Sequence, residues 1–305
     1  MAAGTAGRAK RGIYAAAITP LGADGQPDAA KLAAYCRWLI EAGLDGVAPF
    51  GTTGEGNSLP LAFRCAAPEV LAAQGIAGDQ AILGTGACAT DDAVAATRAA
   101  LDAGFCNTLV LPPFYYKGVS DEGLYSHYAR LIDRIGDARL RVYFYHFPAM
   151  SAVPISVDLV TRLRDAYGVI IAGLKDSSGD LENALSYVRA VPEFDVFPSN
   201  EGVLIEATQQ GCAGIISATT NVAPMLCRQA REAEGAAQEA LVARLRAIRG
   251  AVSKHSLMAA VKAIQARRSE DAGWAAVLPP LVPLSAAAAV QLWSDLAPHL
   301  EEIGI

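Results

Sequence analysis

Several strand-like segments of this sequence end in side chains that could do chemistry, and Lys175 is the most informative of them. It follows the apolar run VIIAGL, so its amine would project from the end of a buried strand. Burial disfavours the charged ammonium, and a neutral amine can attack a ketone to form a Schiff base that stabilises a neighbouring carbanion. The alternative is a lysine that leaves the strand into solvent and pairs with Asp176.

The segment GTTGEG at residues 51–56 places two hydroxyl groups in a turn flanked by glycines. Gly51, Thr53 and the backbone N–H groups of this turn could cradle a small carboxylate. A phosphate is a second possibility, and a plain tight turn is a third. We interpret Glu55 as a partner for backbone N–H groups or for a nearby cation rather than as a base.

Proton transfer needs a hydrogen-bonded relay, and two tyrosines are candidates for it. Tyr145 lies near the end of RVYFYHF, and Tyr116 lies in PPFYYKG. A phenol moves protons when it is hydrogen-bonded into a relay, for which Thr52 is available. Core packing is the competing interpretation for each tyrosine. His146 should point away from Tyr145 on a strand, so we interpret it as a packing or hydrogen-bonded core residue.

Composition and charge argue against several other classes of protein. The chain has 305 residues and a net charge of −6, so no basic surface indicates nucleic-acid binding. No apolar run is long enough to span a membrane, and no signal peptide begins the sequence. The six cysteines are scattered, which favours reduced thiols in a cytoplasmic protein. No metal-ligand spacing and no GxSxG nucleophile motif occurs.

These residues must be positioned by a repeating pattern of strands and helices. Continuously apolar runs, as expected for parallel strands covered on both faces, alternate with Ala-rich helical stretches. Eight such β-then-α units favour a (β/α)8 TIM barrel, whose active site lies at the C-terminal ends of its strands. A Rossmann-like sheet is disfavoured because no GxGxxG follows the first strand. The predicted strands are 12–19, 45–51, 81–87, 108–114, 141–147, 169–175, 194–199 and 214–220.

The strand pattern stops after residue 222, and the rest of the chain is predicted to be helical. Helical stretches cover 224–270 and begin again at 286, after the proline-rich LPPLVPLS. We therefore expect a disordered tail at 1–11, a barrel carrying the active site at 12–223 and a C-terminal helical domain at 224–305.

Taken together, these segments resemble the dihydrodipicolinate synthase / N-acetylneuraminate lyase family over nearly the whole chain. The resemblance is carried by GTTGEGNSL, PPFYYKGVSDEGLYSHY, YHFP, GLKDSSGDL and GIISATTNVAP. It implies a (β/α)8 barrel with C-terminal helices and a class I aldolase or lyase mechanism through a lysine Schiff base. The implied partners are pyruvate or another 2-oxo acid, an aldehyde, and further copies of the chain in a homotetramer built as a dimer of dimers. No metal or organic cofactor is implied.

The resemblance assigns roles position by position. Lys175 corresponds to the Schiff-base lysine, Tyr145 to the general acid/base and Thr52 to the relay threonine. Tyr116 corresponds to a tyrosine that family members lend across a dimer interface to the relay of the neighbouring subunit. The positions assigned to substrate binding, including the pyruvate cradle and the pocket wall, are Gly51, Thr53, Met150, Ser177, Asn200, Glu201 and Ile216.

The same resemblance leaves the second substrate open. In dihydrodipicolinate synthases the residue two beyond the proline of YxxP is an arginine that binds the carboxylate of the aldehyde, and here it is Met150. A thioether cannot replace the charged, bidentate contact of a guanidinium. YHFPAMSAV and SSGDL look closer to N-acetylneuraminate lyases, although His146 replaces the asparagine of YNxP. Asn200 and Glu201 could meet sugar-acid hydroxyls, or Glu201 could be favoured by a helix dipole.

The resulting hypothesis is a Schiff-base lyase that makes or cleaves a C–C bond of a 2-oxo acid, with pyruvate as substrate or product. It covers aldolases of N-acetylneuraminate, of 2-keto-3-deoxy sugar acids and of 4-hydroxy-2-oxoglutarate. The alternatives are a 2-keto-3-deoxy sugar acid dehydratase, a 4-hydroxy-tetrahydrodipicolinate synthase and a non-catalytic 2-oxo acid binding protein. The last is disfavoured because binding alone needs no proton relay.

Overall fold

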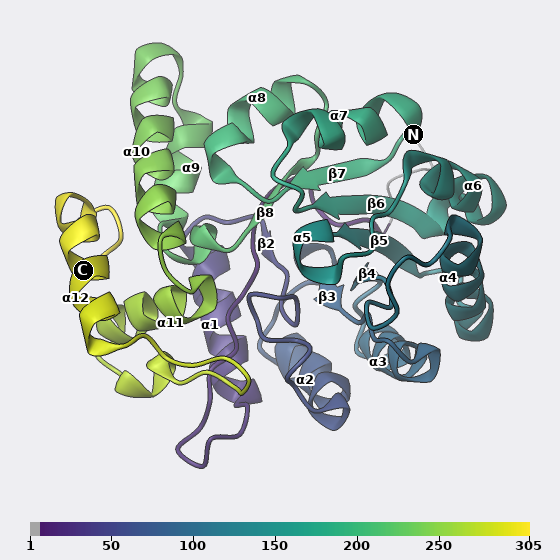
Figure 1. Ribbon diagram of the computed structural model, residues 1–305, viewed down its shortest axis with the longest axis horizontal. Coiled ribbons are helices and arrows are strands. Elements are labelled where there is room, and N and C mark those ends of the chain that lie inside the picture. The colour runs from purple at the N-terminus through teal and green to yellow at the C-terminus, as the bar shows by residue number, and fades with distance from the viewer. Residues whose placement is uncertain (1–6) are drawn as a thin grey trace.

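The computed structural model describes residues 7–305, and within them eight parallel strands form a barrel with helices on its outside (Figure 1). Ladders join β2, β1 and β8 in one group and β3 to β7 in another. A parallel bridge between Val47 and Ala81, and a hydrogen bond from Ala213 N to Val196 O, connect the two groups. The predicted (β/α)8 barrel is confirmed. Its strands are β1 Gly12–Ala15, β2 Gly46–Val47, β3 Leu83–Gly84, β4 Asn107–Val110, β5 Arg141–His146, β6 Ile171–Asp176, β7 Asp195–Pro198 and β8 Gly214–Ser217.

Helices follow the strands, as the alternating pattern predicts, and several begin at a capping side chain. The side chains of Asp28, Ser120, Ser156 and Asp180 accept hydrogen bonds from backbone N–H groups of the first turn that would otherwise lack a partner. One short helix was not predicted and lies directly after β5. The helices are α1 Ala29–Glu41, α2 Leu61–Ala73, α3 Thr90–Asp102, α4 Asp121–Ile135, α5 Pro148–Ser151, α6 Val157–Tyr167, α7 Leu181–Ala190 and α8 Leu204–Gln209.

The strands are apolar along their whole length because both of their faces are buried. On β5, Tyr143 and Tyr145 belong to the cluster inside the barrel, whereas Val142 and Phe144 belong to the layer between strands and helices. This alternation follows from the two-residue period of a strand. It places Tyr145 inside the barrel and turns His146 outward, as predicted.

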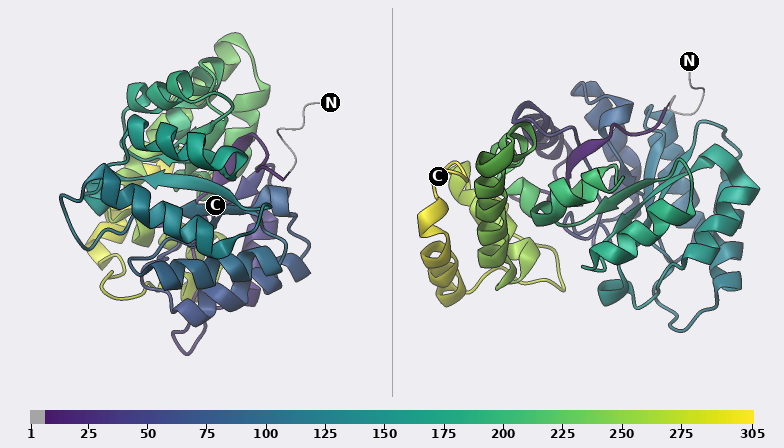
Figure 2. Two further views of the ribbon diagram at one scale, coloured as in Figure 1. Left: turned by 90° about the vertical axis from the view of Figure 1, so that its right-hand side faces the viewer. Right: turned by 90° about the horizontal axis from the view of Figure 1, so that it is seen from above.

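Four C-terminal helices stand beside the barrel, and Figure 2 shows these green-to-yellow segments gathered on one side of it. Their apolar faces join the cluster that includes β1 and α1, where the ring of Trp274 lies 4.8 Å from that of Tyr35. Across residues 7–305, no helix is long and apolar enough to cross a membrane. The helices are α9 Pro224–Glu232, α10 Gly235–Ser253, α11 Leu257–Arg268 and α12 Ala286–Leu296.

The beginning of the chain differs from the tail predicted at 1–11. Residues 1–6 of that prediction lie outside the described residues, but residues 7–11 pack against the N-terminal end of the barrel. Arg8 is buried, and its Nη1 donates to Glu193 O at 2.7 Å. Arg8 and Arg11 both pair with the buried Asp195, at 3.7 and 3.1 Å. Arg8 and Arg11 are therefore both held by the Asp195 carboxylate of β7.

Candidate active site

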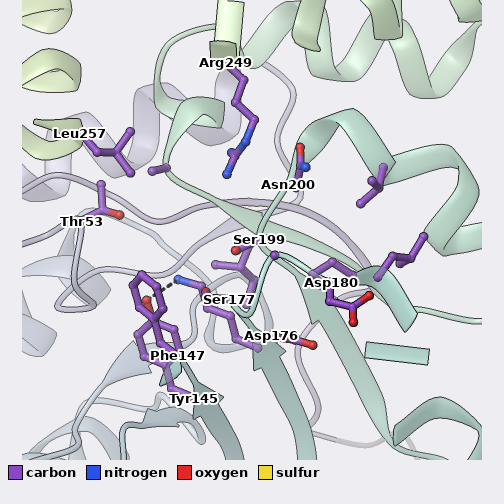
Figure 3. Close-up of a pocket in the computed structure, with 17 residues that line it drawn as sticks. Thr53, Tyr145, Phe147, Asp176, Ser177, Asp180, Ser199, Asn200, Arg249 and Leu257 are labelled. Atoms are coloured by element: carbon purple, nitrogen blue, oxygen red, sulfur yellow. Dashed lines mark hydrogen bonds between the residues drawn. The ribbon is translucent and has the colours of Figure 1, made fainter. Parts of the chain in front are cut away.

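A pocket of ≈ 220 Å³ opens at the C-terminal ends of β5 to β8, and Lys175 and Tyr145 form part of its wall. Figure 3 shows Tyr145 on one side of this pocket and Arg249 on the other. The two residues are direct partners in the ladder between β5 and β6, so both side chains enter the barrel at one level. Lys175 Nζ donates to Tyr145 Oη at 3.2 Å, and Tyr145 Oη donates to Thr52 Oγ1 at 3.2 Å. The structure thus brings the predicted Schiff-base lysine and two of the predicted relay residues, Tyr145 and Thr52, into one hydrogen-bonded series.

The surroundings of Lys175 exclude the interpretation of a solvated lysine. The residue is only 3% exposed, and its ammonium nitrogen lies 4.3 Å from the centroid of the Tyr145 ring. Asp176 is no partner for it, because its carboxylate accepts from Ser178 N at 2.7 Å and from Asn183 Nδ2 at 2.7 Å. A buried amine held by a single phenol is arranged for nucleophilic attack rather than for an ion pair.

The GTTGEG turn contributes Thr53 to the pocket wall, and two of its three glycines have no room for a larger residue. A Cβ atom on Gly56 would lie 1.9 Å from Phe50 O, and one on Gly54 would lie 2.6 Å from Ala17 O. This close packing fixes Thr53, which is 5% exposed and lines the pocket. Gly51 lines a smaller adjoining cavity. A short oxygen-bearing side chain on a rigid turn is suited to orienting a small carboxylate.

Glu55 turns away from the pocket and anchors this turn to the C-terminal helices. Its Oε1 accepts a hydrogen bond from Lys262 Nζ of α11, and its Oε2 accepts one from Leu278 N. The predicted partnership with a cation and a backbone N–H group is confirmed. Both charged side chains are 0% exposed. Burial lowers the pKa of Lys262, and the hydrogen bond that its ammonium donates to Glu55 opposes that change. Lys262 was not predicted from the sequence as a partner of Glu55. The one feature that could have indicated its burial is its position in the apolar helical stretch LMAAVKAIQ.

His146 lies on the outer face of β5 and has a structural contact there. Its Nδ1 accepts a hydrogen bond from Ile155 N at 3.1 Å, and its ring lies near that of Tyr187. Burial lowers the pKa of His146, while the nearby Asp176 carboxylate raises it. The histidine is therefore held as a neutral acceptor, as the prediction of a hydrogen-bonded core residue requires.

Ile216 and Ser177 line the pocket as predicted, whereas two other predicted residues do not. Met150 lies on α5, is 57% exposed and is outside the pocket, because the single helical turn after Pro148 carries it to the surface. Tyr116 is 73% exposed and packs edge-on against Tyr115, away from the pocket of its own chain. Its predicted role in a neighbouring subunit stays a prediction.

Asn200 and Glu201 follow β7, and only Asn200 faces the pocket. Glu201 is 1% exposed, and its carboxylate accepts from the hydroxyls of Ser217, at 2.6 Å, and Thr219. It also accepts from Arg249 Nη1 at 3.2 Å. The side chain of Glu201 is thus bonded to residues at the end of β8 and to α10, outside the pocket wall, and its contact with substrate stays a prediction.

Arg249 of α10 lines the pocket and was not among the predicted site residues. It lies beyond the last strand, on a helix that carries other arginines, so no local pattern distinguishes it. Among residues 7–305, no group of three or more His, Cys, Asp or Glu side chains could hold a metal ion.

The sequence is similar to those of known proteins over most of its length. Residues 9–298 match the model of the dihydrodipicolinate synthetase family. An uncharacterized DapA-like lyase from Chloroflexus aurantiacus is 36% identical over 279 residues, which cover 90% of this chain and 92% of the relative. A 4-hydroxy-tetrahydrodipicolinate synthase from Thiobacillus denitrificans is 33% identical over 220 residues, 72% of each chain.

Solved structures show the same fold. The crystal structure of dihydrodipicolinate synthase from Agrobacterium tumefaciens has a TM-score of 0.82 at 29% identity and covers 95% of this chain and 99% of that one. The structure of YagE, a prophage protein of the dihydrodipicolinic acid synthase family from E. coli K12, was determined in complex with pyruvate. It has a TM-score of 0.84 at 26% identity and covers 94% of this chain and 98% of that one.

Proposed function

Because this chain belongs to the dihydrodipicolinate synthetase family and is a class I lyase of that family, we propose that Lys175 forms its Schiff base with pyruvate or a pyruvate-yielding 2-oxo acid. The observation that carries the proposal is the hydrogen-bonded series Lys175–Tyr145–Thr52 on the wall of a pocket. Pyruvate bound to YagE supports this choice of 2-oxo acid.

The first half of the reaction builds the Schiff base. Lys175 Nζ attacks the C2 carbonyl and gives a carbinolamine, whose hydroxyl leaves as water when it receives a proton. The Tyr145 hydroxyl, 3.2 Å from Nζ, is placed to supply that proton and to recover one from Thr52. The product is an iminium ion at C2, which is a strong electron acceptor.

The second half breaks the C–C bond when the reaction runs as cleavage. Tyr145 takes up the proton of the C4 hydroxyl and passes its own proton back to Thr52. The C3–C4 bond breaks, and its electron pair moves into the iminium ion to give an enamine. The aldehyde leaves, the enamine is protonated at C3, and water releases pyruvate from Lys175. Condensation follows the same steps in reverse. Throughout, Thr53 and the N–H groups of its turn orient the carboxylate of the 2-oxo acid.

The surroundings of the site support an oligomeric, cytoplasmic enzyme. Tyr115 and Tyr116 follow β4 and are 74% and 73% exposed, which suits a surface covered by a second copy of the chain. We infer a homotetramer in which Tyr116 enters the neighbouring relay. The cysteines Cys36, Cys212 and Cys227 are buried as free thiols, in keeping with a reducing compartment.

Borohydride trapping tests the proposal directly. The protein is incubated with pyruvate, reduced with borohydride and digested, and mass spectrometry locates the adduct. We expect the adduct on Lys175, its loss in Lys175→Ala, and its retention in the control Lys254→Ala, since Lys254 is a surface residue paired with Asp295. No adduct on Lys175, under conditions where a known class I aldolase is trapped, would refute the proposal.

A further inference from the structure

Arg249 is held in the pocket wall by contacts that use only one of its three nitrogens. Its Nη1 donates to Glu201 Oε2 at 3.2 Å, to Ser217 Oγ at 3.2 Å and to Thr219 Oγ1 at 3.1 Å. Every hydrogen bond that the structure gives for Arg249, across residues 7–305, involves this one atom. The side chain is 28% exposed, so the rest of the guanidinium faces open space.

The Arg249 side chain points into the pocket, so the open space beside its guanidinium belongs to the pocket. Figure 3 shows Arg249 reaching in from α10 beside Asn200, on the wall opposite Tyr145 and Phe147. The carboxylate that fixes it, Glu201, is 1% exposed and lies outside the pocket. Nε and Nη2 are therefore free to donate, and they form a planar edge whose spacing matches two oxygens of a carboxylate or phosphate.

The other ionisable groups of the wall do not compete for this edge. Asp176 accepts from Ser178 N and Asn183 Nδ2, and Asp180 accepts from Glu182 N as the cap of α7. Both carboxylates therefore accept hydrogen bonds from residues at the rim of the pocket. At the opposite wall, Lys175 is committed to the reacting carbonyl in the mechanism above. A substrate bound there would present the far end of its aldehyde half to α10.

We propose that Arg249 determines the substrate class of this enzyme by binding an anionic group, a carboxylate or a phosphate, at the end of the aldehyde half of the substrate. The proposal is built on the Schiff-base function. It predicts that the protein prefers aldehydes carrying a second negative charge over neutral ones of the same length.

Two matched pairs of aldehydes test this with pyruvate as the fixed partner. Succinic semialdehyde is compared with butyraldehyde for a carboxylate, and glyceraldehyde 3-phosphate with glyceraldehyde for a phosphate. The wild-type chain should prefer the anionic member of at least one pair, and that pair identifies the anion. In Arg249→Met, kcat/KM for the preferred anionic aldehyde should fall by roughly 10- to 100-fold, mainly through KM, because a charge-assisted contact is lost.

Two further variants separate recognition from folding. Arg249→Met leaves the buried Glu201 without its cation, so the double variant Glu201→Gln/Arg249→Met is measured in parallel and should show the same loss of preference. Arg244→Met, on the same helix but paired with Glu302 at 3.5 Å, should retain the wild-type preference.

The outcomes distinguish a failure of this inference from a failure of the Schiff-base function on which it rests. Trapping of pyruvate on Lys175, together with a preference for an anionic aldehyde that Arg249→Met abolishes, supports the inference. Trapping without such a preference in either pair, or an equal loss of kcat/KM for charged and neutral aldehydes in Arg249→Met, overturns the inference alone. Absence of the pyruvate adduct in the wild-type chain overturns the Schiff-base function and this inference with it.

Discussion

Replacing Lys262 with methionine should destabilise the fold strongly, because it removes the cation from a carboxylate that no water can reach. Both side chains of the Lys262–Glu55 pair are 0% exposed. The remaining contact of Glu55, with Leu278 N, is a single dipole and cannot neutralise the charge. Breaking a buried pair by removing one partner costs about 3–5 kcal/mol.

This cost is large against the total stability of a folded domain, which is about 5–15 kcal/mol. A double variant shows whether the cost comes from the orphaned charge. In Lys262→Met/Glu55→Gln, the glutamine can still accept from Leu278 N and methionine fills the space of the lysine chain. Replacing both members of a buried pair is often nearly neutral, so most of the lost free energy of unfolding should return. The control Lys254→Met breaks a pair whose lysine side chain is 62% exposed and should cost less than about 1 kcal/mol.

Urea unfolding followed by circular dichroism measures these differences. All variants are compared at one protein concentration, since association between subunits adds to apparent stability. The reasoning fails if Lys262→Met lies within about 1 kcal/mol of the wild type, or if the double variant is no more stable than the single one.

Two further predictions concern β5. Tyr145→Phe removes the hydroxyl between Lys175 and Thr52, so steady-state kcat should fall about 10²- to 10⁴-fold. Because the same hydroxyl supplies the proton for loss of water from the carbinolamine, borohydride should still trap pyruvate on Lys175, but more slowly than in the wild type. A normal kcat would show that the relay is wrong. Burial lowers the pKa of His146 below the ordinary 6.5, so its contribution to stability is complete above pH 6.5 and is lost as the pH falls through the folded-state pKa. His146→Asn can still accept from Ile155 N and should flatten the dependence of urea unfolding on pH below about 6.5, and an unchanged slope would contradict the assignment.

The sequence could predict the barrel because a strand buried on both faces leaves a continuous apolar run. All eight predicted strands overlap those found within residues 7–305, with shorter bounds in the structure. The one-turn helix α5 was not predictable in this way, because four residues are too few for a helical period to show. That short helix also places Met150 at the surface and outside the pocket lining of its own chain, which the sequence pattern did not indicate.

Within the site, the residues that could be predicted are those whose positions follow from the geometry of the strands. Lys175 and Tyr145 are neighbours because two parallel strands in register point alternate side chains into the barrel. The relay partner Thr52 follows β2 on the glycine-flanked turn, where Gly54 and Gly56 lie too close to neighbouring backbone atoms to accept a side chain.

Glu201 shows why the rest could not be predicted. A carboxylate just after a barrel strand is equally suited to facing substrate or to turning beneath the next strand, and sequence spacing is the same in both cases. The choice depends on Arg249, which comes from a helix outside the barrel and supplies a cation that makes burial of Glu201 favourable. In return, Glu201, Ser217 and Thr219 fix one nitrogen of Arg249 and leave its other edge free. In our proposal the barrel strands supply the residues of the Schiff-base chemistry, and Arg249 of α10 recognises the second substrate.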